Sequence, residues 1–182
     1  MARNFAVIDT ETNWKNEVMS IGVLTANSND FQIKDSRYYI LPEEEAIGGM
    51  YSSTMRITSH EILTGERKEV ITDLRDWLDS KNINDLLAYN ASFDKNHLRE
   101  LHDFRWRDIM KVAAYKQHNP HIPDYLPCCK TGRLRKGYGV EPILKMMDCE
   151  NYCESHNAIM DARDELRIME ILDYELDFYP EI

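Results

Sequence analysis

The clearest apolar pattern in the chain lies near its start, where residues 5–8 (Phe-Ala-Val-Ile) run directly into Asp9-Thr10-Glu11-Thr12. Four consecutive apolar residues predict a strand that is buried on both faces. Two further apolar-rich segments, Val18–Leu24 and Phe31–Leu41, are separated by a turn signal at residues 27–30. Strands joined by such short connections predict an antiparallel meander.

The period of the apolar positions changes after Glu66. From there, apolar residues recur at the spacing of one helix face: Val70, Leu74, Trp77 and Leu78. The irregular stretch before this helix, residues 47–64, predicts a loop and a short helix. Leu86–Tyr89 is a short apolar run that predicts a fourth strand, and it leads into a helix for which Ser92 is the expected N-cap.

From Arg105 onward the chain carries one further strand signal and three helix signals. We expect, in order, a fifth strand over Arg105–Met110, a short helix over Lys111–Gln117, a loop over His118–Pro127, a short helix over Glu141–Met147, and a final helix that begins near His156. That helix carries its apolar residues on one face: Ile159, Ala162, Leu166 and Met169. Together these elements predict an α/β fold with a central mixed five-stranded sheet flanked by helices.

Length and charge narrow the class of protein. The 182 residues suffice for one domain with a full core, so we expect a single domain over residues 1–182. A net charge of −10 argues against a sequence-independent nucleic-acid coat protein, but a nuclease can neutralise its acids with metal ions. No apolar run is long enough to cross a membrane, and the N-terminus shows no signal peptide, so the expected location is the cytoplasm.

Four cysteines leave one alternative open. In a cytoplasmic protein Cys128, Cys129, Cys149 and Cys153 are expected to be reduced thiols. However, Cys149-x3-Cys153-x2-His156 has a spacing similar to that of zinc ligands, and the other two cysteines would complete the set. A structural zinc protein is therefore a competing hypothesis.

The first strand ends in an unusual pair of acids. Residues i and i+2 of an extended chain point to the same side, so Asp9 and Glu11 are expected to face one spot. Two carboxylates that close repel each other, and a divalent cation with oxygen ligands removes the repulsion. The alternative is a loop after the strand with two solvated acids.

Two further acids are attached to buried elements. Asp94 follows the fourth strand at the start of a helix, where ligand sites form in open α/β sheets. Asp161 lies in the last helix among small and apolar residues, where a carboxylate needs a partner. With Asp9 and Glu11 they supply the four acids of a two-metal phosphoryl-transfer site.

His156 is the candidate base for such a site. It stands five residues before Asp161, and at about 100° per residue the two side chains would diverge on one continuous helix. His156 must therefore lie in the loop or first turn before the helix in order to reach the same site. There it could take a proton from an attacking water, whereas the alternative is a surface histidine.

These residues resemble the three motifs of the DEDDh 3′–5′ exonucleases, the DnaQ-like family of the ribonuclease H-like superfamily. Residues 5–12 resemble the first motif, and residues 87–94 (Leu-Ala-Tyr-Asn-Ala-Ser-Phe-Asp) resemble the second, with Tyr89 where a histidine is usual. Residues 156–162 resemble the third, in which His-x4-Asp marks the DEDDh subclass; the sister subclass has a tyrosine at the position of Asn157.

The resemblance implies a metal-dependent 3′–5′ exonuclease that releases nucleoside 5′-monophosphates from 3′ ends of single-stranded DNA or RNA. Asp9 would bridge two divalent ions, Mg²⁺ or Mn²⁺. Glu11 and Asp161 would complete the first ion site, Asp94 would hold the second ion, and His156 would be the general base.

The resemblance also implies substrate contacts. The residues expected to bind substrate are Thr10, Thr12, Trp14, Asn90 and Phe93. The backbone of Thr12 would lie near the terminal 3′-hydroxyl, and Trp14 or Phe93 would pack near the terminal nucleotide, unless these aromatics pack in the core. The basic run 130–136 is a candidate contact for the nucleic-acid backbone, with a solvated loop as the alternative.

The sequence leaves two alternatives for the biological role. Asp-Thr-Glu-Thr in the first motif is closer to the proofreading branch than to the oligoribonuclease branch, which usually has Asp-Leu-Glu-Met. A proofreading role would require a polymerase or another replication or repair protein as partner. The competing hypothesis from another class is a catalytically silent nucleic-acid-binding or polymerase-associated module.

Overall fold

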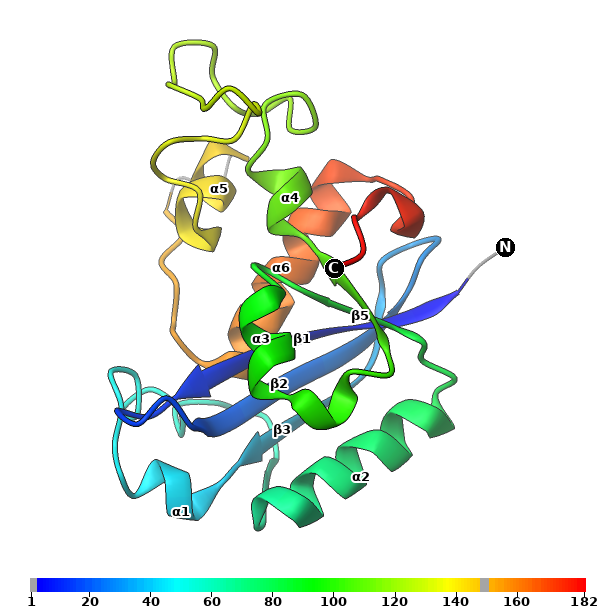
Figure 1. Cartoon of the computed structure of the whole chain (residues 1–182), viewed down its shortest axis with the longest axis vertical. Helices are drawn as coiled ribbons and strands as arrows, with labels where there is room; N and C mark the ends of the chain where they lie inside the picture. Colours follow the sequence, from blue (N-terminus) through cyan, green and yellow to red (C-terminus); the bar gives the residue numbers. More distant parts are fainter. Residues whose placement is uncertain (1–2, 148–150) are drawn as a thin grey trace.

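A mixed sheet forms the centre of the molecule (Figure 1). The structure, a computed structural model, describes residues 3–147 and 151–182. The strands lie in the order β4-β3-β2-β1-β5-β6. Their bounds are β1 Asn4–Thr12, β2 Val18–Asn27, β3 Ile33–Ile40, β4 Ile62–Thr64, β5 Asp85–Ala88 and β6 Arg105–Asp108.

Strand directions confirm the predicted meander and add a strand. β1, β2 and β3 pair antiparallel, whereas β5 and β6 extend the sheet beside β1 in parallel. The predicted count of five strands was wrong, because β4 pairs parallel with β3 at the other edge. β4 has three residues, too few to carry an alternating pattern, and residues 47–61 form turns rather than the expected short helix.

The helices cover both faces of the sheet. Their bounds are α1 Pro42–Glu45, α2 Arg67–Ser80, α3 Ser92–His97, α4 Met110–Ala113, α5 Val140–Met146 and α6 Ala158–Leu172, with short 3₁₀ helices at Arg99–Leu101 and Leu176–Phe178. α6 packs against β1 and β2 with α4 and α5 beside it, whereas α2 lies on the opposite face (Figure 1).

β1 confirms the prediction of a strand buried on both faces. Phe5 and Val7 belong to the core cluster beneath α6, and Ala6 and Ile8 belong to the cluster beneath α2. All four side chains are fully buried. The polar residues of the strand therefore lie on either side of these four positions, with Asn4 at one end and residues 9–12 at the other.

Three predicted boundaries differ from the structure. Ser92 is the first residue of α3 rather than its N-cap, because Asn90 makes a left-handed turn (φ 63°) and Ala91 is already helical. The hydroxyl of Ser92 therefore lacks the extended backbone from which an N-cap reaches the helix N–H groups. The strand expected over Arg105–Met110 ends at Asp108, and the helix expected over Lys111–Gln117 is α4.

A long connection between α4 and α5, which we call the 114–139 excursion, extends away from the sheet (Figure 1, yellow-green). Among the described residues, its strand-like contacts are two isolated bridges, Tyr115 with Arg133 and Cys128 with Leu134. As to membrane insertion, no helix within residues 3–147 and 151–182 has the length and apolar character needed to span a bilayer.

Candidate active site

The five residues predicted to be catalytic line one cleft of about 430 Å³ at the C-terminal end of β1. Asp9 and Glu11 extend from β1, Asp94 from the first turn of α3 and Asp161 from the first turn of α6. His156 lies just before α6, as expected. The parallel pairing of β5 with β1 brings the turn before α3 to the end of β1, so residues distant in sequence meet there.

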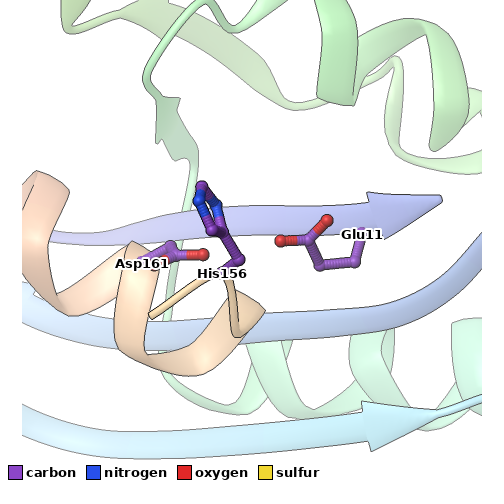
Figure 2. A group of neighbouring side chains, drawn as sticks. All are labelled: Glu11, His156 and Asp161. Atoms are coloured by element: carbon purple, nitrogen blue, oxygen red, sulfur yellow. The ribbon is translucent and has the colours of Figure 1, made fainter. Parts of the chain in front are cut away.

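Three of these side chains are close enough to share one ion. Ligand atoms of Glu11, His156 and Asp161 all lie within 4.8 Å of one another. Figure 2 shows the carboxylates of Glu11 and Asp161 facing each other, with the imidazole of His156 beside them. This arrangement places a histidine and two acids, from opposite ends of the chain, around a common point.

The acids are buried with few partners. Asp161 is 4% exposed, and its Oδ1 has no hydrogen-bond partner among the described residues. Asp94 is 2% exposed and accepts a hydrogen bond from the hydroxyl of Thr10 at 2.8 Å. Because a buried carboxylate without partners is costly, this cluster requires either protons or cations.

The pKa values of the acids are raised accordingly. Burial raises the pKa of Glu11 and Asp94 to about 7 and that of Asp161 to about 8. Burial also raises the pKa of Asp9 well above its ordinary value, and the charges of the neighbouring acids add to the effect. Near neutral pH the cluster holds protons unless a cation replaces them.

A fifth acid of this cluster, Glu165, was missed from the sequence. It lies in α6, one turn after Asp161, is 2% exposed, and its Oε2 has no partner among the described residues. Its charge is the largest neighbouring contribution to the raised pKa of Asp9. The i, i+4 spacing from Asp161, on the buried face of the helix, is the signal that could have revealed it.

His156 is held by a loop that the sequence did not connect with it. Its imidazole stacks on the ring of Tyr51, with centroids 3.9 Å apart and an interplanar angle of 15°. The hydroxyl of Thr54 donates to the carbonyl of His156, and Asn157 donates through Nδ2 to the carbonyls of Thr54 and Met55 at 3.1 and 3.0 Å. The stacked ring and these hydrogen bonds together hold His156 in its left-handed backbone conformation (φ 51°).

The first turn of α6 lies directly on β2. Gly22 pairs with Asp9 in the sheet, and a Cβ added to this glycine would lie 2.1 Å from the carbonyl carbon of Ala158. No side chain larger than hydrogen fits there without moving the helix. This contact brings Asp161 and Glu165 to the level of Asp9.

Comparison with known proteins identifies the fold. No known protein-family pattern and no curated protein sequence matches the chain. A solved 3′-exonuclease described for 3′-end specific recognition of a histone mRNA stem-loop matches with a TM-score of 0.67 and 14% identity, over 93% of this chain and 63% of that one. The nuclease domain of 3′hExo, a DEDDh family member bound to rAMP, matches with a TM-score of 0.64 and 16% identity, over 92% of this chain and 90% of that one. The chain therefore shares the fold of these exonucleases.

The same likeness extends to E. coli Exonuclease I in complex with a dT13 oligonucleotide, with a TM-score of 0.64 and 13% identity. This chain is covered over 96% of its length but spans only 42% of that enzyme. The ribonuclease H-like fold implied by the three motifs is therefore confirmed, in a chain shorter than two of these exonucleases.

All five residues expected to bind substrate line the cleft of this fold: Thr10, Thr12, Trp14, Asn90 and Phe93. Trp14 is 68% exposed and Phe93 is 39% exposed, so the alternative that these aromatics pack in the core was wrong. The side chain of Thr10 is engaged with Asp94. Met50, Tyr51 and Glu154 also line the cleft, although no motif pointed to them.

The zinc alternative gains no support from the described cysteines. Cys128, Cys129 and Cys153 are free thiols and do not belong to the group of possible metal ligands found in the described part of the chain. His156, which that alternative needed, faces Glu11 and Asp161 instead. Cys149 lies outside the described residues, so its part in the hypothesis stays untested.

A larger cavity of about 720 Å³ lies elsewhere, between β3, β4 and α2. The acids lining it include Asp73, paired with Arg37, and Asp35, paired with Lys81. The hydrogen bond from the Tyr39 hydroxyl and the ion pair with Arg37 lower the pKa of Asp73, and Lys81 lowers that of Asp35, the opposite of what happens in the cleft. The candidate active site is thus distinguished by its unpaired buried acids rather than by size.

Proposed function

We propose that residues 1–182 form one metal-dependent 3′–5′ exonuclease domain. It would hydrolyse phosphodiester bonds at the 3′ ends of single-stranded DNA or RNA and release nucleoside 5′-monophosphates. The observation that carries this proposal is the convergence of Asp9, Glu11, Asp94, His156 and Asp161 on one cleft. The exonuclease fold of the structural neighbours supports it.

The acids fit two divalent cations, Mg²⁺ or Mn²⁺. Asp9, Glu11 and Asp161 would hold one ion, and Asp9 with Asp94 would hold the other. Buried carboxylate oxygens, among them the unpartnered Oδ1 of Asp161, are the donors that hard cations prefer. When bound, the ions would neutralise the acids and stabilise the charge that develops on the leaving 3′ oxygen.

The remaining chemistry would be supplied by other side chains that line the cleft. His156, braced by Tyr51, would take the proton of the attacking water. Thr10 would orient the carboxylate of Asp94 through its hydrogen bond. The exposed rings of Trp14 and Phe93 would contact the terminal nucleotide, and Thr12 and Asn90 would lie along its sugar: all four line the cleft.

Both kinds of nucleic acid remain substrates in this proposal. Among the structural neighbours, one nuclease domain was solved with rAMP and E. coli Exonuclease I with dT13. Discrimination would depend on contacts to the 2′-hydroxyl. A polymerase or another replication or repair protein as partner stays a prediction.

The direct test is degradation of matched single-stranded DNA and RNA oligonucleotides, labelled at the 5′ end, by the pure protein with Mn²⁺. We expect a ladder that shortens from the 3′ end, with nucleoside 5′-monophosphates as products. Asp9→Asn should abolish it, because the central charge is lost while the shape is kept. Absence of degradation of both substrates would favour the silent-module hypothesis.

A second substitution separates the two roles open to His156. His156→Ala should lower kcat by about 10²–10⁴-fold if the imidazole is the general base. Mn²⁺ binding, followed by calorimetry, should then be retained. A loss of Mn²⁺ binding would make His156 a metal ligand, a role that its distance from Glu11 and Asp161 also permits. His60→Ala, at a histidine that does not line the cleft, is the matched control.

A further inference from the structure

Basic side chains without acidic partners gather on the 114–139 excursion. Within the described part of the chain, none of Lys130, Arg133, Arg135 and Lys136 takes part in an ion pair, although the protein carries a net charge of −10. The excursion contains a single acid, Asp124, which is paired with Lys116 at 2.8 Å. Arginines elsewhere are largely paired with carboxylates: Arg3, Arg37, Arg56, Arg67, Arg75, Arg105 and Arg107. The excursion is therefore a local cationic surface on an acidic protein.

This surface is fixed to the rest of the molecule. The backbone N–H of Leu134 donates to the carbonyl of Ala114 at 2.9 Å, and that of Lys116 donates to the carbonyl of Gly132 at 3.0 Å. The Leu134 side chain is fully buried in the core. Because neighbouring residues of an extended segment point to opposite sides, Arg133 and Arg135 are directed away from that core. The cations thus project from an anchored backbone.

The cationic surface is also joined to the cleft. Tyr89 lines the cleft, and its hydroxyl donates to the backbone carbonyl of Tyr138 at the end of the excursion. The guanidinium of Arg133 lies 5.2 Å from the centre of the Tyr138 ring. Tyr89, Tyr138 and Arg133 therefore form a continuous contact path from the acidic site to the first of the unpaired cations. Tyr89 is the residue at which the second motif departs from its usual histidine.

We propose that Lys130, Arg133, Arg135 and Lys136 bind the sugar–phosphate backbone of a single strand whose 3′ end occupies the cleft. This proposal rests on the proposed function. The five acids that line the cleft offer a polyanion no positive charge of their own, and cations placed along the strand but away from the cleft supply the attraction. Since the contacts are to phosphates, the surface should serve DNA and RNA alike.

The test compares two double variants that remove the same charge. Lys130→Gln/Lys136→Gln changes two exposed lysines of the surface. Lys68→Gln/Arg99→Gln changes two exposed cations, one on α2 and one on the 3₁₀ helix Arg99–Leu101, on the other face of the sheet. Binding of a fluorescent single strand of roughly 20 nucleotides and its degradation are measured at several salt concentrations. Hydrolysis of the nitrophenyl ester of thymidine 5′-monophosphate, which is too small to reach the excursion, reports on the cleft alone.

We expect the surface variant to weaken binding of the strand about tenfold at moderate salt, with the slope of log K against log salt reduced by about 0.7 for each phosphate that the variant no longer binds. Ester hydrolysis should be unchanged, and the control variant should behave like the wild type. An equal loss of strand binding in both variants would mean that net charge rather than this surface matters, which overturns the proposal. Unchanged strand binding would also overturn it and would favour an acidic protein as the partner of the excursion.

Failure of the proposed exonuclease function would give a different result from failure of this surface proposal. A protein that degrades neither strand nor ester, yet binds the strand through the excursion, would retain the surface and lose the exonuclease. Arg133→Gln provides a second measurement, because it removes the cation that stacks on Tyr138. It should weaken strand binding without changing ester hydrolysis, and a loss of ester hydrolysis alone would assign Arg133 to the cleft instead.

Discussion

At the scale of single residues, the site depends on side chains that hold the reactive groups as much as on those groups themselves. The imidazole of His156 has Tyr51 stacked on one face, and its backbone is tied to Thr54. A base that is presented on a short loop needs such support, because displacement by about 1 Å can cost a large factor in rate. We therefore propose that Tyr51 positions this base.

Substitutions at Tyr51 test this role. Tyr51→Ala should lower kcat by about 10–100-fold, because the imidazole loses the ring that orients it, while Mn²⁺ binding and the melting temperature change little. Tyr51→Phe keeps the stacked ring and should restore nearly wild-type kcat. Steady-state kinetics on a short oligonucleotide, together with calorimetric titration of Mn²⁺, decides the matter. Equal kcat values for the two variants would contradict the positioning role.

At the scale of elements, the site forms where the first turn of α6 packs against the centre of the sheet. β2 is buried almost throughout, and Gly22 lets the backbone of Ala158 approach it. The helix thereby sets Asp161 and Glu165 beside β1. A change at Gly22 should act on the site without touching any of its side chains.

Gly22→Ala should destabilise the protein by about 1–3 kcal/mol, because the added Cβ must displace the helix backbone. The same displacement should weaken Mn²⁺ binding by moving Asp161 away from Glu11. Gly139→Ala is the control, since its Cβ would lie 3.9 Å from the nearest atom, and it should cost less than about 1 kcal/mol. Denaturant unfolding and Mn²⁺ titration measure both effects. Wild-type stability in Gly22→Ala would show that the helix is not held there.

At the scale of the whole molecule, two sets of acids respond to pH in opposite ways. Exposed carboxylates in ion pairs, such as Asp103 with Arg75, have lowered pKa values and lose their stabilising effect only in acid. Glu11, Asp94 and Asp161 have pKa values raised to about 7 or 8 by burial. Between about pH 4 and about pH 8 the folded protein therefore binds more protons than the unfolded chain.

It follows that, without divalent ions, the free energy of unfolding should fall as pH rises from about 5 to about 8, since the buried acids must then ionise side by side. Mg²⁺ should reverse most of this loss, because it binds the ionised form. Denaturant unfolding at several pH values, with and without Mg²⁺, tests the point. A stability that rises with pH in the absence of Mg²⁺ would exclude the raised pKa values.

The local pattern of apolar and polar positions predicted those elements whose burial leaves a regular pattern in the sequence. The run 5–8 could be predicted because a strand buried on both faces is continuously apolar, and the meander because turn signals separate its apolar segments. The helices α2 and α6 could be predicted because helical spacing reports which side chains face a core. β4 left no such signal because it is three residues long. The boundary at Ser92 was displaced because a left-handed turn at Asn90 starts the helix early.

The sequence by itself determined which reactive residues to look for in the cleft, since its three motifs contain Asp9 and Glu11, Asp94, and His156 with Asp161. Only the tertiary structure decided what surrounds them. Tyr51 and Glu165 approach the site through packing of a distant loop and through one face of α6, and no local pattern encodes such contacts. The burial that raises the pKa values likewise arises only when helices cover the sheet. The contact path from Tyr89 to the 114–139 excursion also depends on tertiary packing.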